Sequence, residues 1–258
     1  MNRKLPIGEI FTAALKLPLQ HTRKLILLGF PALLMLMLFD YIIPESMDFS
    51  VGKTELFIQL TVGLLTCLSI VIAVVGCHRT FLMKNNEKPL FWSGNEFSYF
   101  IWWIAMSLYI ILILIPFALL LIPLTAYLEP FETEWIAIVG MLLLNIPMYY
   151  LISRWSLLLP AVATDKRGVD ISWSWRLSKG NSWRLTLLIG LFPFTKEMIF
   201  AFIPVTESLL LSLVDNLMWL VIGIVEVGLL SLSYEFLVNN QAQDPEVNDT
   251  EMPEPEQA

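Results

Sequence analysis

Charged side chains are scarce in this sequence. Asp, Glu, Lys and Arg make up 15% of its 258 residues, whereas a typical soluble domain contains about 25%. Hydrophobic residues make up 57% and lie in long blocks rather than in short periodic stripes. A soluble core of this size could not bury so much apolar surface. The scarcity of charge therefore excludes an ordinary soluble domain and predicts helices that lie in lipid.

Residue types that carry out chemistry are equally scarce. Cys67 and Cys77 lie in one apolar block, where cysteine is a small hydrophobe rather than a disulfide or metal ligand. His21 and His78 lie beside basic residues at predicted helix ends, which favours contact with lipid headgroups over catalysis. The sequence has no His-Glu-x-x-His motif, phosphate-binding glycine loop or Ser-His-Asp set. It also has no single basic patch for nucleic acid. We therefore expect no enzymatic activity and no cofactor.

Six apolar blocks predict an all-α, polytopic membrane protein in which residues 1–238 form one domain. At 1.5 Å of rise per residue, each block approaches the length of a hydrocarbon core of roughly 30 Å. The predicted spans are about 25–43, 56–77, 99–121, 135–153, 183–203 and 209–237. The fifth span is interrupted by Pro193, Lys196, Glu197 and Pro204. It either crosses the membrane or forms a broken or re-entrant segment.

Shorter elements are predicted between and beside the spans. An amphipathic helix at residues 6–17 is expected to lie in the membrane surface and to end at Pro18, with one apolar stripe of Ile7, Ile10, Phe11, Ala14 and Leu15. A turn at 165–168 precedes a second interfacial helix at 169–179, which ends at Gly180. Pro116 and Pro123 are expected to bend the third span and to leave an irregular or surface-lying piece after residue 121.

The basic residues predict the orientation. In the six-span arrangement, 14 of the 16 Lys and Arg residues fall on one side, and only Lys53 and Lys196 fall on the other. The positive-inside rule places the first group, and with it the N-terminus, in the cytoplasm. The C-terminus follows to the same side if the fifth span crosses, and to the opposite side if it does not. Residues 239–258 carry six acidic and no basic residues, which predicts a disordered acidic tail.

Ionisable residues inside predicted spans are candidates for function, because a charge in lipid is costly. Arg154 on the fourth span and Glu226 on the sixth lie at matching depths, which predicts an ion pair. The alternative is that each side chain reaches water separately. Asp215 lies three turns before Glu226 on the same side of the sixth span. This arrangement allows a path for protons or cations, whereas the more common alternative is that each carboxylate reaches water at its own end of the span.

Residues 149–190 resemble a family. The pattern comprises an Arg before an apolar stretch that ends in Pro-Ala, an acidic turn with Gly, and a Trp, Ser, Lys-Gly and Trp-Arg series. It is carried by Arg154, Pro160, Ala161, Asp165, Gly168, Trp175, Ser178, Lys179, Gly180, Trp183 and Arg184. This segment resembles bacterial inner-membrane proteins of the YciC-like kind, which are related to the membrane domain of some glycerophosphodiester phosphodiesterases. The resemblance implies an inner-membrane location and no phosphodiesterase activity, since no catalytic domain of that type is present.

We call residues 154–184 the elbow, because they connect the fourth and fifth predicted spans on the cytoplasmic side. The candidate contacts for lipid headgroups or for a protein partner are Arg167, Arg176, Lys179, Trp183 and Arg184. The alternative for these residues is that they only fix the depth of the helices. The preferred function is therefore a non-enzymatic inner-membrane protein with a binding elbow. A small transporter or export permease that uses Asp215 and Glu226 is the second hypothesis.

Overall fold

The computed structural model describes residues 4–42, 52–83, 94–128, 134–193 and 209–241. Every regular element in these ranges is a helix, which confirms the predicted all-α class. The elements are α1 (Ile7–Gln20), α2 (Thr22–Ile42), α3 (Lys53–Leu82), α4 (Asn95–Leu128), α5 (Glu134–Trp155), α6 (Leu158–Ala163), α7 (Ile171–Leu177), α8 (Ser182–Leu185), the π-helix η2 (Thr186–Gly190) and α10 (Leu209–Gln241).

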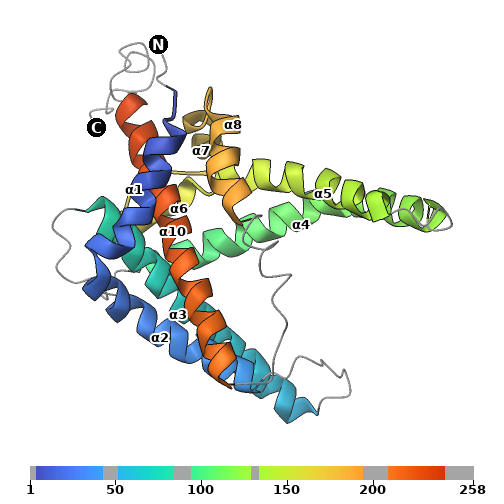
Figure 1. Cartoon of the computed structure of the whole chain (residues 1–258), viewed down its shortest axis with the longest axis horizontal. Coiled ribbons are helices and arrows are strands. Elements are labelled where there is room, and N and C mark those ends of the chain that lie inside the picture. The colour runs from blue at the N-terminus through green and yellow to red at the C-terminus, as the bar shows by residue number, and fades with distance from the viewer. Residues whose placement is uncertain (1–3, 43–51, 84–93, 129–133, 194–208, 242–258) are drawn as a thin grey trace, which may run out of the picture.

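The long helices form two arms that meet at one end (Figure 1). The first arm contains α2, α3 and α10, and the second contains α4 and α5. The short helices α6, α7 and α8 lie with α1 where the arms meet, and we call this region the junction. Four helices in the described chain are long and apolar enough to cross a membrane: Thr22–Ile42, Lys53–Leu82, Asn95–Pro116 and Leu210–Gln241. This is the composition of a membrane-embedded protein, whereas the predicted count of six spans is not confirmed.

Large apolar side chains are exposed along both arms. Phe30 on α2, Leu60 on α3, Leu112 on α4 and Leu210 on α10 all present more than half of their surface. Lipid is the solvent in which such a surface is stable. The fourth predicted span corresponds to α5, and the fifth begins with α8 and η2. Residues 194–203 of the fifth span lie outside the described residues.

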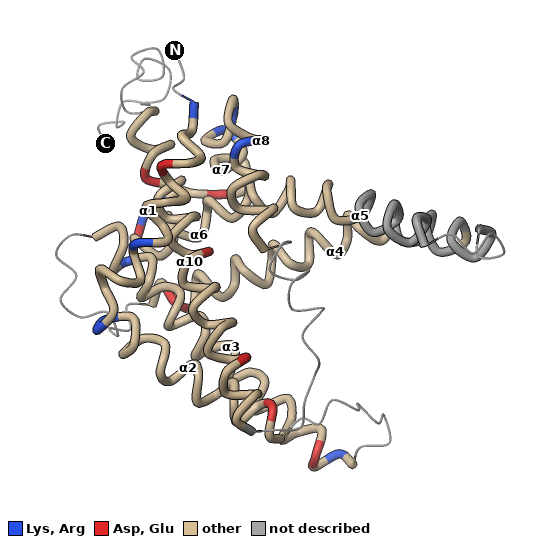
Figure 2. The backbone as a smooth tube through the Cα atoms, in the orientation of Figure 1, with Lys and Arg blue, Asp and Glu red and all other residues tan. Residues whose placement is uncertain are grey.

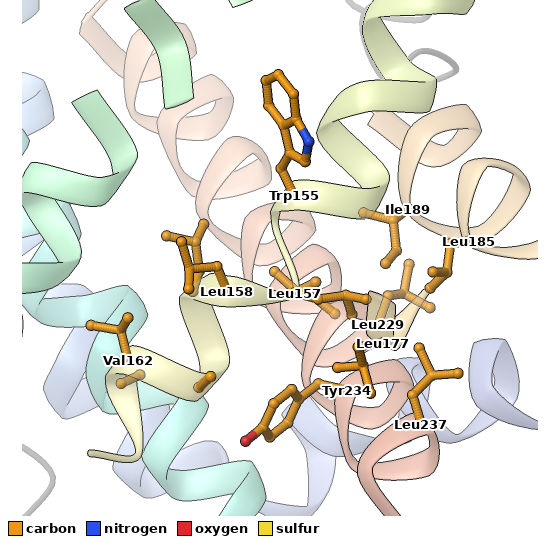
Figure 3. Close-up of a cluster of buried hydrophobic side chains, with 14 of the residues drawn as sticks. Trp155, Leu157, Leu158, Val162, Leu177, Leu185, Ile189, Leu229, Tyr234 and Leu237 are labelled. Atoms are coloured by element: carbon orange, nitrogen blue, oxygen red, sulfur yellow. The ribbon is translucent and has the colours of Figure 1, made fainter. Parts of the chain in front are cut away.

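The largest core of the described residues lies at the junction rather than along the arms. Figure 3 shows side chains from α5, α6, α7, α8, η2 and α10 packed together there. The cluster includes Trp155, Leu157, Leu158, Val162, Leu177, Leu185, Ile189, Leu229, Tyr234 and Leu237. Leu5, before α1, is fully buried in the same cluster. The junction is thus a packed globular core to which the apolar arms are attached.

The predicted end of the first helix at Pro18 is wrong, and the third predicted span continues as a helix past residue 121. α1 continues through Pro18 to Gln20, and α4 contains both Pro116 and Pro123 and continues to Leu128. Proline removes one backbone hydrogen bond and bends a helix. In α4, where lipid offers the backbone no other hydrogen-bond partner, proline does not end the helix. Of the two alternatives for the piece after residue 121, irregular or surface-lying, the irregular one is wrong, because this piece is helical to Leu128.

The apolar stripe of α1 faces protein. Ile10, Ala14 and Leu17 are buried, whereas Leu15, which was assigned to the stripe, is 44% exposed. The opposing surface is α10, where a Cβ atom placed on Gly228 would lie 3.1 Å from Leu17 Cδ1. The missing side chain of Gly228 therefore allows α1 to approach α10 closely. The apolar stripe of α1 therefore packs mainly against α10 and not against the membrane surface.

Small residues of α3 pack inside the first arm. Thr66, Ala73, Gly76 and Cys77 are buried. The Thr66 hydroxyl lies 2.8 Å from the Val62 carbonyl of its own helix and 3.2 Å from the Met35 carbonyl of α2. Close packing through small residues is the usual mode of helix association in lipid.

The helices alternate in direction, which places both described ends of the chain at the junction. At the far end of the first arm, Ser212 near the start of α10 donates a hydrogen bond to Asp40 near the end of α2. At the junction, Lys4 and Asn239 line one groove between α1 and α10. η2 therefore lies at the junction, whereas α10 begins at the far end of the first arm. The end of α10 thus lies on the same side as the start of α1. Asn239–Gln241, which were assigned to the tail, continue α10, and residues 242–258 lie outside the described residues.

Candidate functional site: the elbow and the polar layer beside it

The elbow folds as the sequence predicts. Asp165 and Gly168 both adopt positive φ angles, 61° and 71°, in the predicted turn. The Asp170 carboxylate then accepts a hydrogen bond from the Trp173 backbone N–H at 2.5 Å and caps the start of α7. After α7, Gly180 has a φ of 83°, which is the left-handed conformation that favours glycine after a helix. Local turn chemistry thus fixes the elbow at both ends of α7.

Arg154 holds α7 against the end of α5. Its Nε donates to Ser178 Oγ at 2.7 Å, its Nη2 donates to the Trp175 carbonyl at 2.7 Å, and its Nη1 donates to Tyr150 Oη at 3.1 Å. The guanidinium carbon lies 3.4 Å from the centroid of the Trp175 ring. Ser174 returns a hydrogen bond to the Arg154 carbonyl. The guanidinium is therefore enclosed by two aromatic rings and by the end of α7.

These partners differ from the predicted one. All three nitrogen atoms of the Arg154 guanidinium are engaged within the elbow and α5, and not by Glu226, which lies half-buried on α10. The buried charge is stabilised by stacking on Trp175. It also lies at the carboxyl ends of two helices, α5 and α7, where the helix dipole favours a cation. The Trp175 carbonyl that accepts its hydrogen bond belongs to the last turn of α7.

The candidate contact residues divide into two groups. Arg167, Arg176 and Lys179 are exposed, and Trp183 presents 65% of its surface. Arg184 is half-buried, and its Nη1 donates to the Leu5 carbonyl at 2.7 Å. The Leu5 backbone N–H in turn donates to Asn181 Oδ1 at 2.8 Å. Arg184 thus fastens the N-terminal segment to the elbow, a role that the sequence analysis did not predict.

Lys166 adds a further cation at the turn of the elbow. Its Nζ lies 4.7 Å from the centroid of the Trp173 ring. Partial burial lowers the pKa of the Lys166 amine, because desolvation disfavours its charged form. The Trp173 ring also contacts Tyr234 of α10, with 6.3 Å between the ring centroids. Through these two contacts, Trp173 connects the turn to the last part of α10.

Beside the elbow, a layer of buried polar residues joins α3, α4, α6 and α10. Arg79 Nη1 forms an ion pair with Glu96 Oε1 at 2.7 Å, and Arg79 Nε donates to the Ala163 carbonyl at 3.0 Å. The sequence analysis did not single out this pair. In the sequence, Arg79 follows the second predicted span and Glu96 precedes the third. Because only a short connection separates the two positions, their proximity could have been inferred.

His78 belongs to the same layer and is fully buried, so its predicted contact with lipid headgroups is wrong. The Ser231 hydroxyl lies 2.7 Å from the Val227 carbonyl, to which it donates its hydrogen bond. Ser231 Oγ is therefore the acceptor for His78 Nδ1 at 2.8 Å. The other ring nitrogen, Nε2, accepts from Tyr99 Oη at 3.4 Å. This chain of hydrogen bonds assigns the neutral imidazole with its proton on Nδ1.

The pair of Ser231 and His78 has the residue types of a nucleophile and its base, but not the geometry. Both side chains are fully buried, and the proton of Ser231 is directed to a carbonyl rather than to the imidazole. Two open grooves of about 440 and 490 Å³ lie along α1, and neither is lined by these residues. No group of three or more potential metal ligands occurs in the described part of the chain. The layer therefore supports packing between helices.

The fold and the elbow together define a class: an all-helical protein with membrane-length apolar arms and a basic, aromatic elbow at their junction. No protein-family model, curated protein or solved structure matches the chain. The interpretation of the elbow therefore depends on its own geometry and charge.

Proposed function

We propose that this chain is a non-enzymatic integral protein of the bacterial inner membrane that binds anionic lipid headgroups through the elbow. The observation that supports this most directly is the exposure of Arg167, Arg176, Lys179 and Trp183 along the elbow, from its turn through α7 to α8. A basic residue near an anionic surface contributes about 1 kcal/mol to binding. Tryptophan prefers the headgroup region of the bilayer.

The base of the elbow supports the proposal because it fixes the backbone of α7 before any ligand binds. Arg154, Ser174 and Ser178 fasten α7 to α5 through buried hydrogen bonds. A preformed site loses less conformational freedom on binding than a mobile loop does. Among the described residues, none of the three exposed cations forms an ion pair with a carboxylate. Their charge is thus available to a phosphate group.

The distribution of charge supports the orientation. Blue segments gather around the junction in Figure 2, whereas Lys53 stands at the far end of the first arm, where α3 begins. With the junction in the cytoplasm, the positive-inside rule is satisfied and both described chain ends are cytoplasmic. In this proposal α5 is a further crossing beyond the four apolar helices, and the predicted span at 183–203, of which residues 194–203 lie outside the described residues, is the sixth. The resemblance of residues 149–190 to YciC-like proteins supports the inner membrane as the location.

The test compares lipid binding by two variants of equal charge. The elbow variant is Arg167→Gln/Arg176→Gln/Lys179→Gln, and the control variant is Lys16→Gln/Arg23→Gln/Lys53→Gln, which removes three exposed cations elsewhere. Native mass spectrometry would count the phosphatidylglycerol molecules retained during titration in detergent. We expect the elbow variant to bind phosphatidylglycerol at least roughly tenfold more weakly than the control variant. Equal binding by the two variants would refute the proposal, and a protein retained at fixed stoichiometry would point to a partner instead.

Transport is the second candidate, and one contact favours it. Asp40 on α2 accepts hydrogen bonds from Asn216 Nδ2 at 2.6 Å and from Ser212 Oγ at 3.0 Å, both on α10. With Asp215 and Glu226 on α10, the first arm therefore carries several carboxylates, which are costly in lipid and often mark ion paths. Uptake or efflux in proteoliposomes that is abolished by Glu226→Gln or Asp40→Asn would support transport. Unchanged flux in both variants would exclude this use of the carboxylates.

A further inference from the structure

The position of the last helix determines where the acidic end of the chain begins. Leu237 of α10 packs in the junction core with Leu177 of α7 and Leu185 of α8 (Figure 3). Tyr234 contacts Trp173 of α7. α10 ends at Gln241, about one helical turn beyond Leu237. The described chain therefore ends at Gln241, at the junction and on the same side of the arms as the elbow.

The charges of the two segments are opposite. Residues 242–258 contain no Lys or Arg and six acidic residues: Asp244, Glu246, Asp249, Glu251, Glu254 and Glu256. The elbow contains six basic and two acidic residues. One of the acidic residues, Asp170, is already used to cap α7. The other, Asp165, is exposed in the turn, so the exposed charges of the elbow are mainly basic.

The acidic segment is long enough to cover this surface. Its 17 residues span at most about 56–61 Å when fully extended. An attached segment within reach of its binding surface has an effective concentration in the millimolar range. Weak individual contacts between carboxylates and exposed Lys or Arg, each small in water, can therefore add up to substantial occupancy.

We propose that residues 244–256 bind the basic face of the elbow and compete there with anionic lipid headgroups. The segment acts as an internal, reversible occupant of the elbow. This inference rests on the proposed function, because the segment and the lipid headgroups compete for the same cations: Arg167, Arg176 and Lys179. A high density of anionic lipid displaces the segment, and a neutral surface allows it to return. Because the contacts are exposed, salt weakens them over a Debye length of about 8 Å at physiological ionic strength.

The first experiment measures the distance between tail and elbow in the full chain. Spin labels are placed at Thr250→Cys and at Ser172→Cys, an exposed position on α7, after Cys67→Ala and Cys77→Ala have removed the native thiols. In phosphatidylcholine nanodiscs at low salt, we expect one short, narrow distance distribution. Salt on the order of 0.5 M, which screens surface charges, should broaden this distance distribution and shift it to longer distances. Added phosphatidylglycerol should have the same effect.

The matched variant replaces all six acids of the segment with Asn or Gln. It should give the long, broad distribution under every condition. A label pair at Thr250→Cys and Thr54→Cys, at the far end of α3, serves as a second control and should stay long throughout. Identical distances for the wild-type and the neutralised segment would overturn the inference.

Measurements of lipid binding distinguish a failure of this inference from a failure of the proposed function. The neutralised segment should raise phosphatidylglycerol binding several-fold, and this gain should vanish when Arg167→Gln/Arg176→Gln/Lys179→Gln is added. If the elbow substitutions weaken lipid binding but the neutralised segment changes neither binding nor distance, the competition fails and the lipid site stands. If the elbow substitutions leave lipid binding unchanged, the proposed function fails, and with it the competition.

Discussion

Arg79 and Glu96 form a buried ion pair, with 2.7 Å between Arg79 Nη1 and Glu96 Oε1, that joins the last turn of α3 to the first turn of α4. Each charge also lies at the helix end that its sign favours, the cation at a carboxyl end and the carboxylate at an amino end. Because Arg79 donates in addition to the Ala163 carbonyl of α6, one side chain ties the two arms to the junction.

Removing one member of this pair should be costly, because the other charge remains buried. We expect Glu96→Gln and Arg79→Met each to lower the free energy of unfolding by about 3–5 kcal/mol. The double variant Arg79→Met/Glu96→Gln should lose less than the sum of the single losses. Unfolding by denaturant in detergent micelles measures these values, with the exposed Glu55→Gln of α3 as the control. Additive losses would show that the two charges are not coupled.

The positions of the long helices could be predicted from the sequence because the membrane imposes their length. α2 and α10 start within a few residues of their predicted spans, since about 20 apolar residues leave few alternatives. The turn at 165–168 and the end near Gly180 could also be predicted, because both depend on local backbone chemistry.

The partners of the buried charges could not be predicted in the same way. The predicted ion pair of Arg154 and Glu226 was based only on the depths of the two residues along straight helices. The partners found, Trp175 and Ser178, lie more than 20 residues further along the chain and reach Arg154 only because α7 folds back. His78 was assigned to the surface because basic residues flank it, but α10 and α4 cover it with Ser231 and Tyr99. Such contacts depend on tertiary packing, which a hydropathy pattern does not contain.

Two serines of α10 provide a matched test of the hydrogen-bond chain at His78. Ser231 and Ser233 are both fully buried. Ser231 accepts from His78, whereas Ser233 Oγ has no hydrogen-bond partner within the described chain. Ser231→Ala should lower the free energy of unfolding by about 1–3 kcal/mol, because it leaves the His78 N–H buried without an acceptor. Ser233→Ala should change it little or raise it. Equal losses in denaturant unfolding would contradict the assigned tautomer and its role.

Arg154 should not tolerate replacement by lysine. An ammonium group carries the same charge, but it cannot stack on Trp175 and donate to both Ser178 and the Trp175 carbonyl at once. We expect Arg154→Lys to loosen α7, which faster amide hydrogen exchange at 171–178 would report, and to lower the melting temperature. Arg176→Lys changes an exposed cation of the same element and should affect neither. Unaltered exchange in Arg154→Lys would mean that charge alone holds the elbow.

Gly190 should be required where η2 packs against α5. A Cβ atom at this position would lie 2.9 Å from Tyr149 Cβ and 3.3 Å from the Tyr149 carbonyl oxygen. These atoms belong to or adjoin the backbone of α5, so they cannot rotate away, and the helices must separate. We expect Gly190→Ala to lower the free energy of unfolding by about 1–3 kcal/mol. Gly8→Ala in α1 is the matched control, since no atom lies within 4 Å of its added Cβ, and alanine favours a helix by up to about 1 kcal/mol. Thermal unfolding in detergent should therefore shift in opposite directions for the two variants. A melting temperature that rises in both would show that η2 and α5 are not in close contact in the folded protein.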